Sequence, residues 1–97
     1  MRHFHRTSLS PAEVMTEADR YFVALGLTRT SAAGTSRDFT GVLGTMTVNV
    51  RMEGGHYTMV EAYTDQVGES RLDKNVKKFF VALHRASDPR HRIEAGY

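Results

Sequence analysis

Cysteine is absent from this chain of 97 residues. Disulfide bonds, thiolate metal sites and cysteine nucleophiles are therefore excluded, and the absence fits a reducing compartment. Long apolar runs are also missing, so no membrane-spanning segment is expected. The opening residues, MRHFHRTSLS, include basic side chains but no apolar run behind them, which argues against a secretory signal. We therefore expect a soluble, cytoplasmic protein.

A strong charge of one sign is missing as well. Thirteen basic residues stand against eleven acidic ones, which gives a formal net charge of +2. Much of the excess lies near the two ends, at Arg2, Arg6, Arg85, Arg90 and Arg92. A nucleic-acid-binding domain of this size usually carries a stronger basic stripe. The overall charge therefore argues against nucleic acid as a partner.

The apolar content of 40% is enough for one compact domain and too little for two. We assign residues 1–88 to a single compact α+β domain and residues 89–97 to a flexible C-terminal tail. A domain of this size has little stability to spare, so self-association or docking onto a partner would be an ordinary way to bury more area.

Capping signals and apolar periodicity predict two helices. The first begins at Ser10, where Glu13 completes a capping box, and ends at Gly26, which can adopt a left-handed conformation. The second begins after Ser70, with Asp73 three residues later, and ends before Pro89. The apolar stripes of the two helices comprise Met15, Ala18, Phe22 and Leu25, and Leu72, Val76, Phe79, Phe80 and Leu83.

Between the helices the apolar period changes from 3.6 to 2, which is typical of strands. Glycine-containing turns divide this region into four strands at about 27–32, 36–43, 45–53 and 56–64. A short opening strand is expected at 2–8. Each connection in the four-stranded region is too short for a crossover, so the strands should form an antiparallel meander.

The predicted fold is a two-layer α+β domain with the order strand, helix, four antiparallel strands, helix. Both helices should pack on one face of a curved antiparallel sheet, because each has only one apolar stripe to bury. The residues predicted to lie in the core include Phe22, Leu25, Val48, Val50, Phe80 and Leu83.

A strand leading into LSPAEV, then a sheet, then a long helix after TDQVGESRLDKN resembles the helix-grip fold of the START and polyketide-cyclase superfamily. The same order equally resembles the TATA-box-binding-protein-like fold. The resemblance covers most of the chain, but it is one of element order and not of signature residues. The chain is shorter than a usual helix-grip protein and lacks its second pair of strands, so the ligand pocket of that superfamily is not carried over.

The segment MTVNVRMEGGHYTMVEAYT, residues 46–64, allows two hairpin registers. With a two-residue turn, Glu61 lies opposite Val48 and points into the core, where desolvation would raise its pKa. With a three-residue turn, Val50 pairs with Val60 and the core row is apolar throughout. The second register avoids a buried charge and is therefore favoured.

In the favoured register, one row of side chains lies on the sheet face away from the helices. This row and its neighbour are the candidate ligand-binding or interface residues: Arg51, Tyr57, Met59, Glu61 and Tyr63. Two tyrosines and a methionine make this face more apolar than is usual for a solvent-exposed sheet face, which suggests that a partner covers it. A second copy of the chain is the simplest cover, because a two-fold axis makes one patch self-complementary. Arg51 is then expected to pair with Glu61.

The histidines and serines do not predict catalytic or metal chemistry. His3 and His5 share one face of a strand at a spacing able to hold a metal, but nothing places His56, His84 or His91 as a third ligand. No Gly-x-Ser-x-Gly elbow is present, and the glycine spacing fits no phosphate loop. We therefore predict no catalytic residues, no metal and no cofactor.

Three classes of function remain. The first is a small non-enzymatic binding or interaction module, a homodimer through its sheet face or edge, with a small apolar ligand between helices and sheet as a further option. The second is an enzyme of the cyclase or small hydrolase kind, with Glu61 as general base and Tyr57 or Tyr63 positioning a substrate. The third is nucleic-acid binding through the sheet, which ranks last because only Arg37 and Arg51 would contact phosphates.

Overall fold

The structure is a computed structural model that describes residues 1–87, so the predicted flexible tail at 89–97 lies outside it. The elements are β1 (Arg2–Thr7), α1 (Pro11–Ala24), β2 (Thr28–Ala33), β3 (Ser36–Gly41), β4 (Gly44–Glu53), β5 (Tyr57–Thr64) and α2 (Arg71–Ser87). Within residues 1–87, neither helix is long and apolar enough to cross a membrane.

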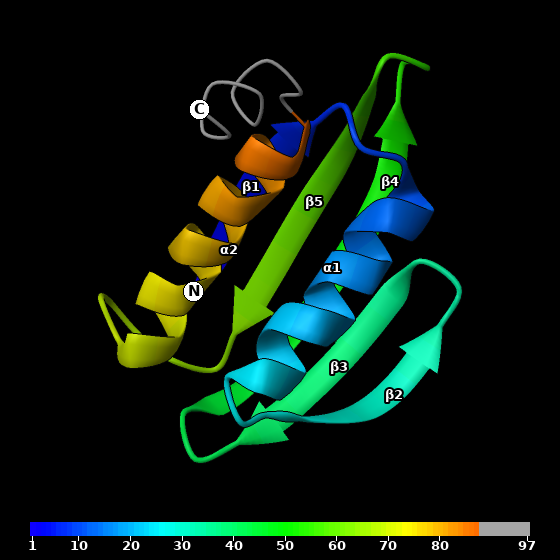
Figure 1. Cartoon of the computed structure of the whole chain (residues 1–97). Helices are drawn as coiled ribbons and strands as arrows, with labels where there is room; N and C mark the ends of the chain where they lie inside the picture. The colour runs from blue at the N-terminus through cyan, green and yellow to red at the C-terminus, as the bar shows by residue number, and fades with distance from the viewer. Residues whose placement is uncertain (88–97) are drawn as a thin grey trace, which may run out of the picture.

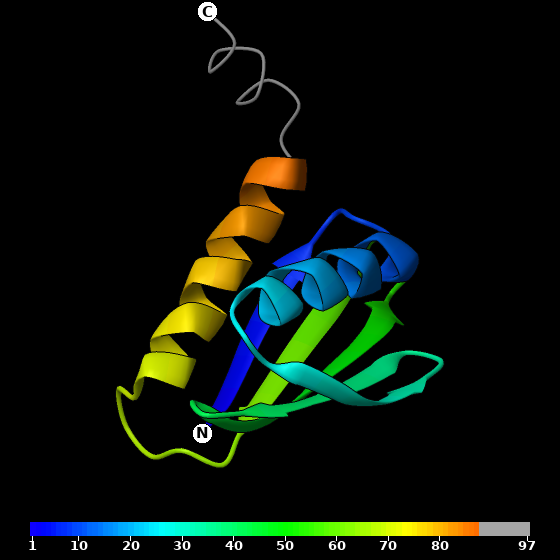
Figure 2. The same cartoon turned by 60° about the horizontal axis from the view of Figure 1, so that its bottom comes forward.

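The five strands form one antiparallel sheet in the order β1-β5-β4-β3-β2. The meander from β2 to β5 agrees with the prediction, and β1 joins it at the edge beside β5. Both helices lie over the same face of the sheet (Figure 1). In Figure 2 the sheet curves around α1, with β2 and β3 set at an angle to β1 and β5. The predicted α+β class and element order are confirmed.

Local capping interactions define both ends of α1. The Ser10 hydroxyl accepts a hydrogen bond from the Glu13 amide at 3.2 Å, and the Glu13 carboxylate accepts one from the Ser10 amide at 3.1 Å. At the other end Gly26 has a φ of 104°, and the Leu27 amide donates to the Phe22 carbonyl at 3.0 Å. The predicted capping box and glycine cap are both confirmed.

The core between helices and sheet is built around three phenylalanines. Phe22 of α1 lies between Phe39 of β3 and Phe79 of α2, with ring centroids 5.4 Å and 5.0 Å away, and all three are fully buried. The predicted core residues Phe22, Val48, Val50 and Leu83 are buried. These three rings join α1, α2 and β3 in one aromatic cluster.

Two other predicted core residues, Leu25 and Phe80, are only partly buried. Leu25 occupies the C-cap of α1, where the helix ends. Phe80 packs at the margin of the core, stacked on His5 of the edge strand β1 with ring centroids 5.1 Å apart. Both residues belong to the apolar stripes of their helices, but they lie at the rim of the core and not in its centre.

The hairpin between β4 and β5 adopts the favoured register. Val50 pairs with Val60 and Val48 with Ala62, on the face that the helices cover. The turn occupies residues 54–56, and its two glycines have φ values of 64° and 74°. The apolar row therefore faces the core, and the row containing the carboxylate faces away from the helices.

Candidate functional site

The face of the sheet away from the helices carries a continuous group of long side chains. Strand pairing places Phe4 of β1 opposite Glu61 of β5, and Arg6 of β1 and Arg51 of β4 on either side of Met59. Directly paired residues of an antiparallel sheet project from the same face. We call this group the open-face patch; it comprises Arg2, Phe4, Arg6, Arg51, Tyr57, Met59, Glu61 and Tyr63. All five predicted site residues are therefore brought together.

Glu61 lies at the centre of the open-face patch and is only 6% exposed. Its carboxylate accepts hydrogen bonds from the Tyr63 hydroxyl and the Arg51 guanidinium, so the expected ion pair with Arg51 is present. The bond from Tyr63, followed by that from Arg51, lowers the pKa of Glu61. The same bond raises the pKa of Tyr63. Glu61 is thus held as a carboxylate with its charge satisfied.

The arginines of β1 organise the edge of the patch. The Arg2 guanidinium lies 4.4 Å from the centre of the Phe4 ring and 5.7 Å from that of Tyr63. Arg6 contacts Glu53 at 3.2 Å. Cation–π contacts at exposed sites contribute about 0.5–1 kcal/mol each. Arg2 therefore contacts both aromatic rings at this edge of the patch.

Exposure within the patch differs from the expectation for Met59. Met59 is 8% exposed, whereas Phe4 and Tyr57 are about half exposed, at 50% and 52%. Met59 is covered because Arg6 and Arg51 flank it on both neighbouring strands, and long cationic side chains lay their aliphatic stems over apolar neighbours. The apolar surface that the patch offers a partner is therefore that of Phe4 and Tyr57.

Sequence reasoning missed the three β1 members of the patch, Arg2, Phe4 and Arg6. The pairing of β1 with β5 joins segments about fifty to sixty residues apart, and no local sequence pattern predicts it. The alternation of these three residues with His3 and His5 was a usable signal, because alternate side chains of a strand share one face.

Arg37 lies on the other face of the sheet from the one expected. It pairs with Val48, whose side chain is buried beneath the helices, and it contacts Asp19 of α1 at 3.4 Å. Phe39, two residues along the same strand, is fully buried on that face. Arg37 is therefore removed from the possible contacts of the open face.

The geometry does not favour Glu61 as a general base. The side chain lies across the sheet from both helices, so it cannot line a space between helices and sheet. A lowered pKa also weakens a carboxylate as a proton acceptor. A surface groove of about 340 Å³ runs between the start of α1 and the end of α2, and it is lined by Leu9, Ala12, Glu13, Thr16, Glu17 and Ala86. No predicted site residue lines it.

A second polar cluster surrounds Asp73 of α2, which is 1% exposed. Its carboxylate accepts hydrogen bonds from the hydroxyls of Ser70 at 2.6 Å and Thr64 at 2.8 Å, and lies 2.7 Å from the His3 ring. Burial alone would raise the pKa of Asp73, but the bonds from Ser70, His3 and Thr64 outweigh it and lower the pKa. The carboxylate sits between serine and histidine, so the order is not that of a catalytic triad. The cluster joins α2 to β1 and β5.

The two histidines of β1 have separate environments under α2. His3 contacts Asp73, whereas His5 stacks on Phe80 and its buried Nε2 atom has no hydrogen-bond partner. Burial, followed by the nearby His84, lowers the pKa of His5. Among residues 1–87, no three histidine, aspartate or glutamate side chains are grouped so that they could hold a metal ion.

No known protein-family model matches this chain, and no curated protein matches it as a relative. Its function is therefore inferred from the geometry of the open-face patch.

Proposed function

We propose that the protein is a non-enzymatic interaction module that forms a homodimer through the open-face patch. The observation that supports this proposal is the half-exposed pair Phe4 and Tyr57, which flanks an already satisfied charge network on a sheet face without helices. Full burial of an aromatic side chain of this kind contributes about 1.5–3 kcal/mol, so covering the pair favours association.

The charges of this face suit a second copy of the same chain. Arg2, Arg6 and Arg51 stand beside the carboxylates Glu53 and Glu61, so both signs are present within one patch. A two-fold axis allows a cation of one copy to meet a carboxylate of the other. Because Arg51 already pairs with Glu61, a partner can cover that carboxylate without leaving a buried charge unpaired.

The size of the face predicts a weak dimer. The eight residues of β5 span about 27 Å at about 3.4 Å each, and the three strands that carry the patch, about 4.8 Å apart, cover a width of about 14 Å. Such a patch offers about 400 Å² per copy, or about 800 Å² in total, which lies at the weak end of interfaces. Association is therefore expected at tens of micromolar and not at nanomolar concentration.

An enzyme of the cyclase or small hydrolase kind is the less favoured alternative. It would need Glu61 free to take a proton, but Tyr63 and Arg51 stabilise the charged carboxylate. A small apolar ligand between helices and sheet is also less favoured, because phenylalanine side chains occupy that space. The proposed resemblance to the helix-grip and TATA-box-binding-protein-like folds concerns architecture and assigns no ligand.

Sedimentation equilibrium at tens of micromolar tests the homodimer. The wild type should sediment as a dimer, and Phe4→Lys and Tyr57→Lys should each sediment as monomers. Met59→Lys is a poorer probe, because Met59 is already covered within the monomer. Val23→Lys is the matched control, since Val23 is 54% exposed on α1, away from the open face. A monomeric wild type, or equal weakening by Val23→Lys, would contradict the proposal.

A further inference from the structure

The outward face of α2 carries a straight row of cationic side chains. Arg71, Lys74, Lys78 and Arg85 are separated by three, four and seven residues, a spacing that places them on one side of an α-helix. All four are exposed, and the opposite side of α2 packs into the core. We call these four residues the α2 basic stripe.

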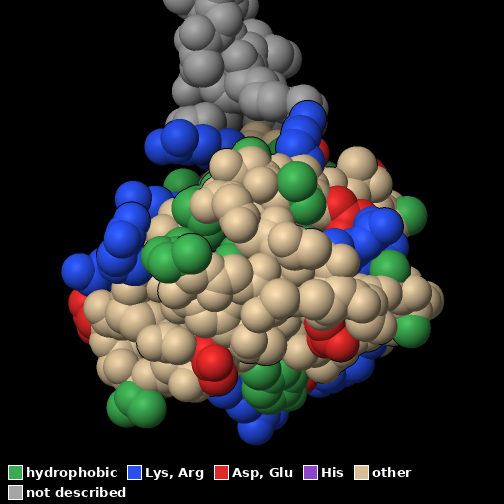
Figure 3. Space-filling view, turned by 90° about the horizontal axis from the view of Figure 1, so that it is seen from below, with side chains coloured by type: hydrophobic (Ala, Val, Ile, Leu, Met, Phe, Trp, Pro, Cys, Tyr) green, Lys and Arg blue, Asp and Glu red, His purple; other side chains and the backbone are tan. Residues whose placement is uncertain are grey.

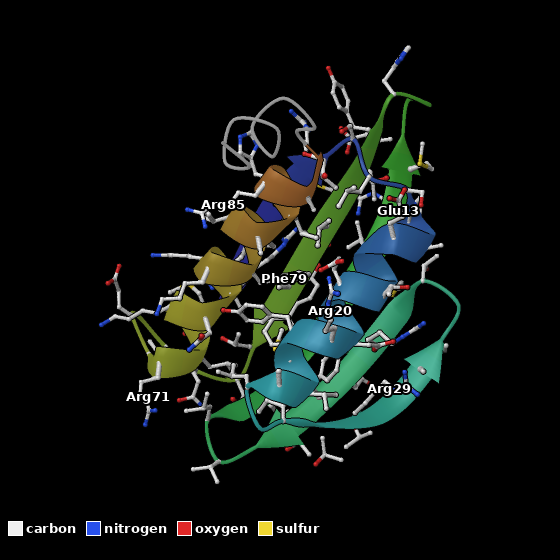
Figure 4. The ribbon with its side chains drawn as sticks, in the orientation of Figure 1. Glu13, Arg20, Arg29, Arg71, Phe79 and Arg85 are labelled. Atoms are coloured by element: carbon white, nitrogen blue, oxygen red, sulfur yellow. The ribbon has the colours of Figure 1, made fainter. Side chains whose placement is uncertain are left out.

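The figures place the stripe on the outside of the molecule. Figure 4 shows Arg71 and Arg85 near the two ends of α2, pointing away from the body, while Phe79 points towards α1. Figure 3 shows lysine and arginine side chains gathered along the side on which α2 lies. The stripe extends over about 21 Å, at about 1.5 Å of rise per residue.

The near-neutral chain conceals this concentration of charge. Helix α2 holds five lysines and arginines against one carboxylate, Asp73, which is buried and turned inward. A net +4 on α2 within a chain of +2 leaves −2 for all other residues. Lys77, beside the stripe, contacts Glu69 at 3.2 Å. In the described part of the chain the four stripe residues form no ion pair.

We propose that the α2 basic stripe binds the phosphate backbone of nucleic-acid duplexes. Its length suits this partner, because one strand of B-form DNA carries a phosphate charge about every 3.4 Å along the axis. A narrow row of cations fits a line of phosphates. This surface differs from the open-face patch, where Arg6 and Arg51 already pair with Glu53 and Glu61. It also stays exposed when that patch is covered by a second copy.

The stripe binds without reading base sequence. Base recognition uses amide and guanidinium groups that reach base edges together. The two guanidinium groups of the stripe, on Arg71 and Arg85, lie about 21 Å apart along α2, and the amide of α2 is already occupied. Asn75 accepts a hydrogen bond from the Tyr21 hydroxyl at 3.2 Å and donates one to the Arg71 carbonyl at 2.8 Å. The remaining contacts are between side-chain cations and phosphates, which carry no sequence information.

An anionic membrane is a poorer partner for the same charges. Helices that lie on membranes bury an apolar face with leucine and aromatic side chains in the lipid. The apolar face of α2 is used in the core, and beside the stripe only Val81 is both apolar and exposed, at 50%. The stripe could attract an anionic membrane by its charge, but it has no apolar side chains to insert into the lipid.

Fluorescence anisotropy with a labelled DNA duplex of about two helical turns tests this proposal. Four phosphate contacts predict a slope of log K against log salt of about −3.6, and about 150-fold weaker binding at about 200 mM than at about 50 mM salt. Two duplexes of unrelated sequence should bind equally. No binding at the lower salt concentration, or a strong preference for one sequence, would overturn the proposal.

Paired substitutions locate the binding surface. Lys74→Gln with Lys78→Gln removes two contacts and should weaken binding about 200-fold at about 50 mM salt, with the slope reduced to about −1.8. Arg71→Gln with Arg85→Gln should do the same, which guards against a folding defect in either pair. Arg20→Gln with Arg29→Gln removes equal charge from α1 and β2 (Figure 4) and should leave the slope unchanged.

Two results would contradict the proposal that the stripe binds nucleic-acid duplexes. One is an equal loss of affinity in the Arg20 and Arg29 control, which would show that net charge alone attracts the duplex. The other is binding to vesicles of phosphatidylserine in phosphatidylcholine at a salt concentration at which the duplex does not bind. That result would identify the stripe as a membrane contact.

Discussion

Arg51 donates a hydrogen bond to Glu61 from the neighbouring strand, and the pair lies on the sheet face that neither helix covers. Tyr63, from the same face, donates to the other carboxylate oxygen. The side chain of Glu61 is almost covered, although it stands on the open side of the domain. A charged group can be buried there because two donors replace the water it loses.

Removing either donor should raise the pKa of Glu61. Tyr63→Phe should raise it more than Arg51→Gln does, because the bond from Tyr63 is the larger cause of the lowered pKa. Carbon-13 NMR of the Glu61 carboxyl group during a pH titration measures both shifts. Thr47→Val changes the same face without touching Glu61 and should leave that pKa unchanged. An unaltered pKa in Tyr63→Phe would show that this hydrogen bond does not form in solution.

The register of the β4–β5 hairpin could be predicted because its two alternatives differ in the placement of one charge. A core-facing Glu61 would have been desolvated, and that cost selected the three-residue turn. The ends of α1 were equally predictable, since Ser10, Glu13 and Gly26 act within a few residues of one another. These features depend on short stretches of chain.

Features set by distant pairing were not predictable in the same way. Phe79 and Phe80 both belong to the apolar stripe of α2, but Phe79 packs on Phe22 of α1 whereas Phe80 stacks on His5 of the edge strand β1. Asp73 was expected only as part of a helix start. Its bonds to His3 and Thr64 depend on β1 and β5 meeting under α2.

Asp73→Ala should destabilise the domain by about 2–4 kcal/mol. The substitution leaves partly buried partners on β1, β5 and the helix N-terminus without their acceptor. Hydrogen bonds to a charged group contribute about 1.5–3 kcal/mol each. Urea unfolding at neutral pH measures the loss. Asp38→Ala is the matched control, because that partly exposed carboxylate accepts from Thr47 at 2.7 Å and should cost about 1 kcal/mol. Equal losses in both variants would mean that the Asp73 cluster has no special role.

The pH dependence of stability should reveal the partly buried ring of His5. Its pKa in the folded state is lowered by burial and then by His84, so the folded protein favours the neutral ring. The unfolded chain binds the proton more readily, with a pKa of about 6.5. The contribution of His5 to stability is therefore complete above about pH 6.5 and declines as the pH falls below that value.

His5→Phe should remove this decline while keeping an aromatic ring against Phe80. Urea unfolding at about pH 7.5 and about pH 5.5, on either side of the unfolded-state pKa, should show the wild type losing more stability on acidification than the variant does. His56→Phe supplies the control, since His56 lies exposed in the turn at 54–56. This variant should lose as much stability on acidification as the wild type does. The contrary result is that His5→Phe loses as much stability as the wild type does between these two pH values. That result would mean that the folded protein protonates the His5 ring as readily as the unfolded chain does. The packing of α2 over β1 would then not exclude water from this ring.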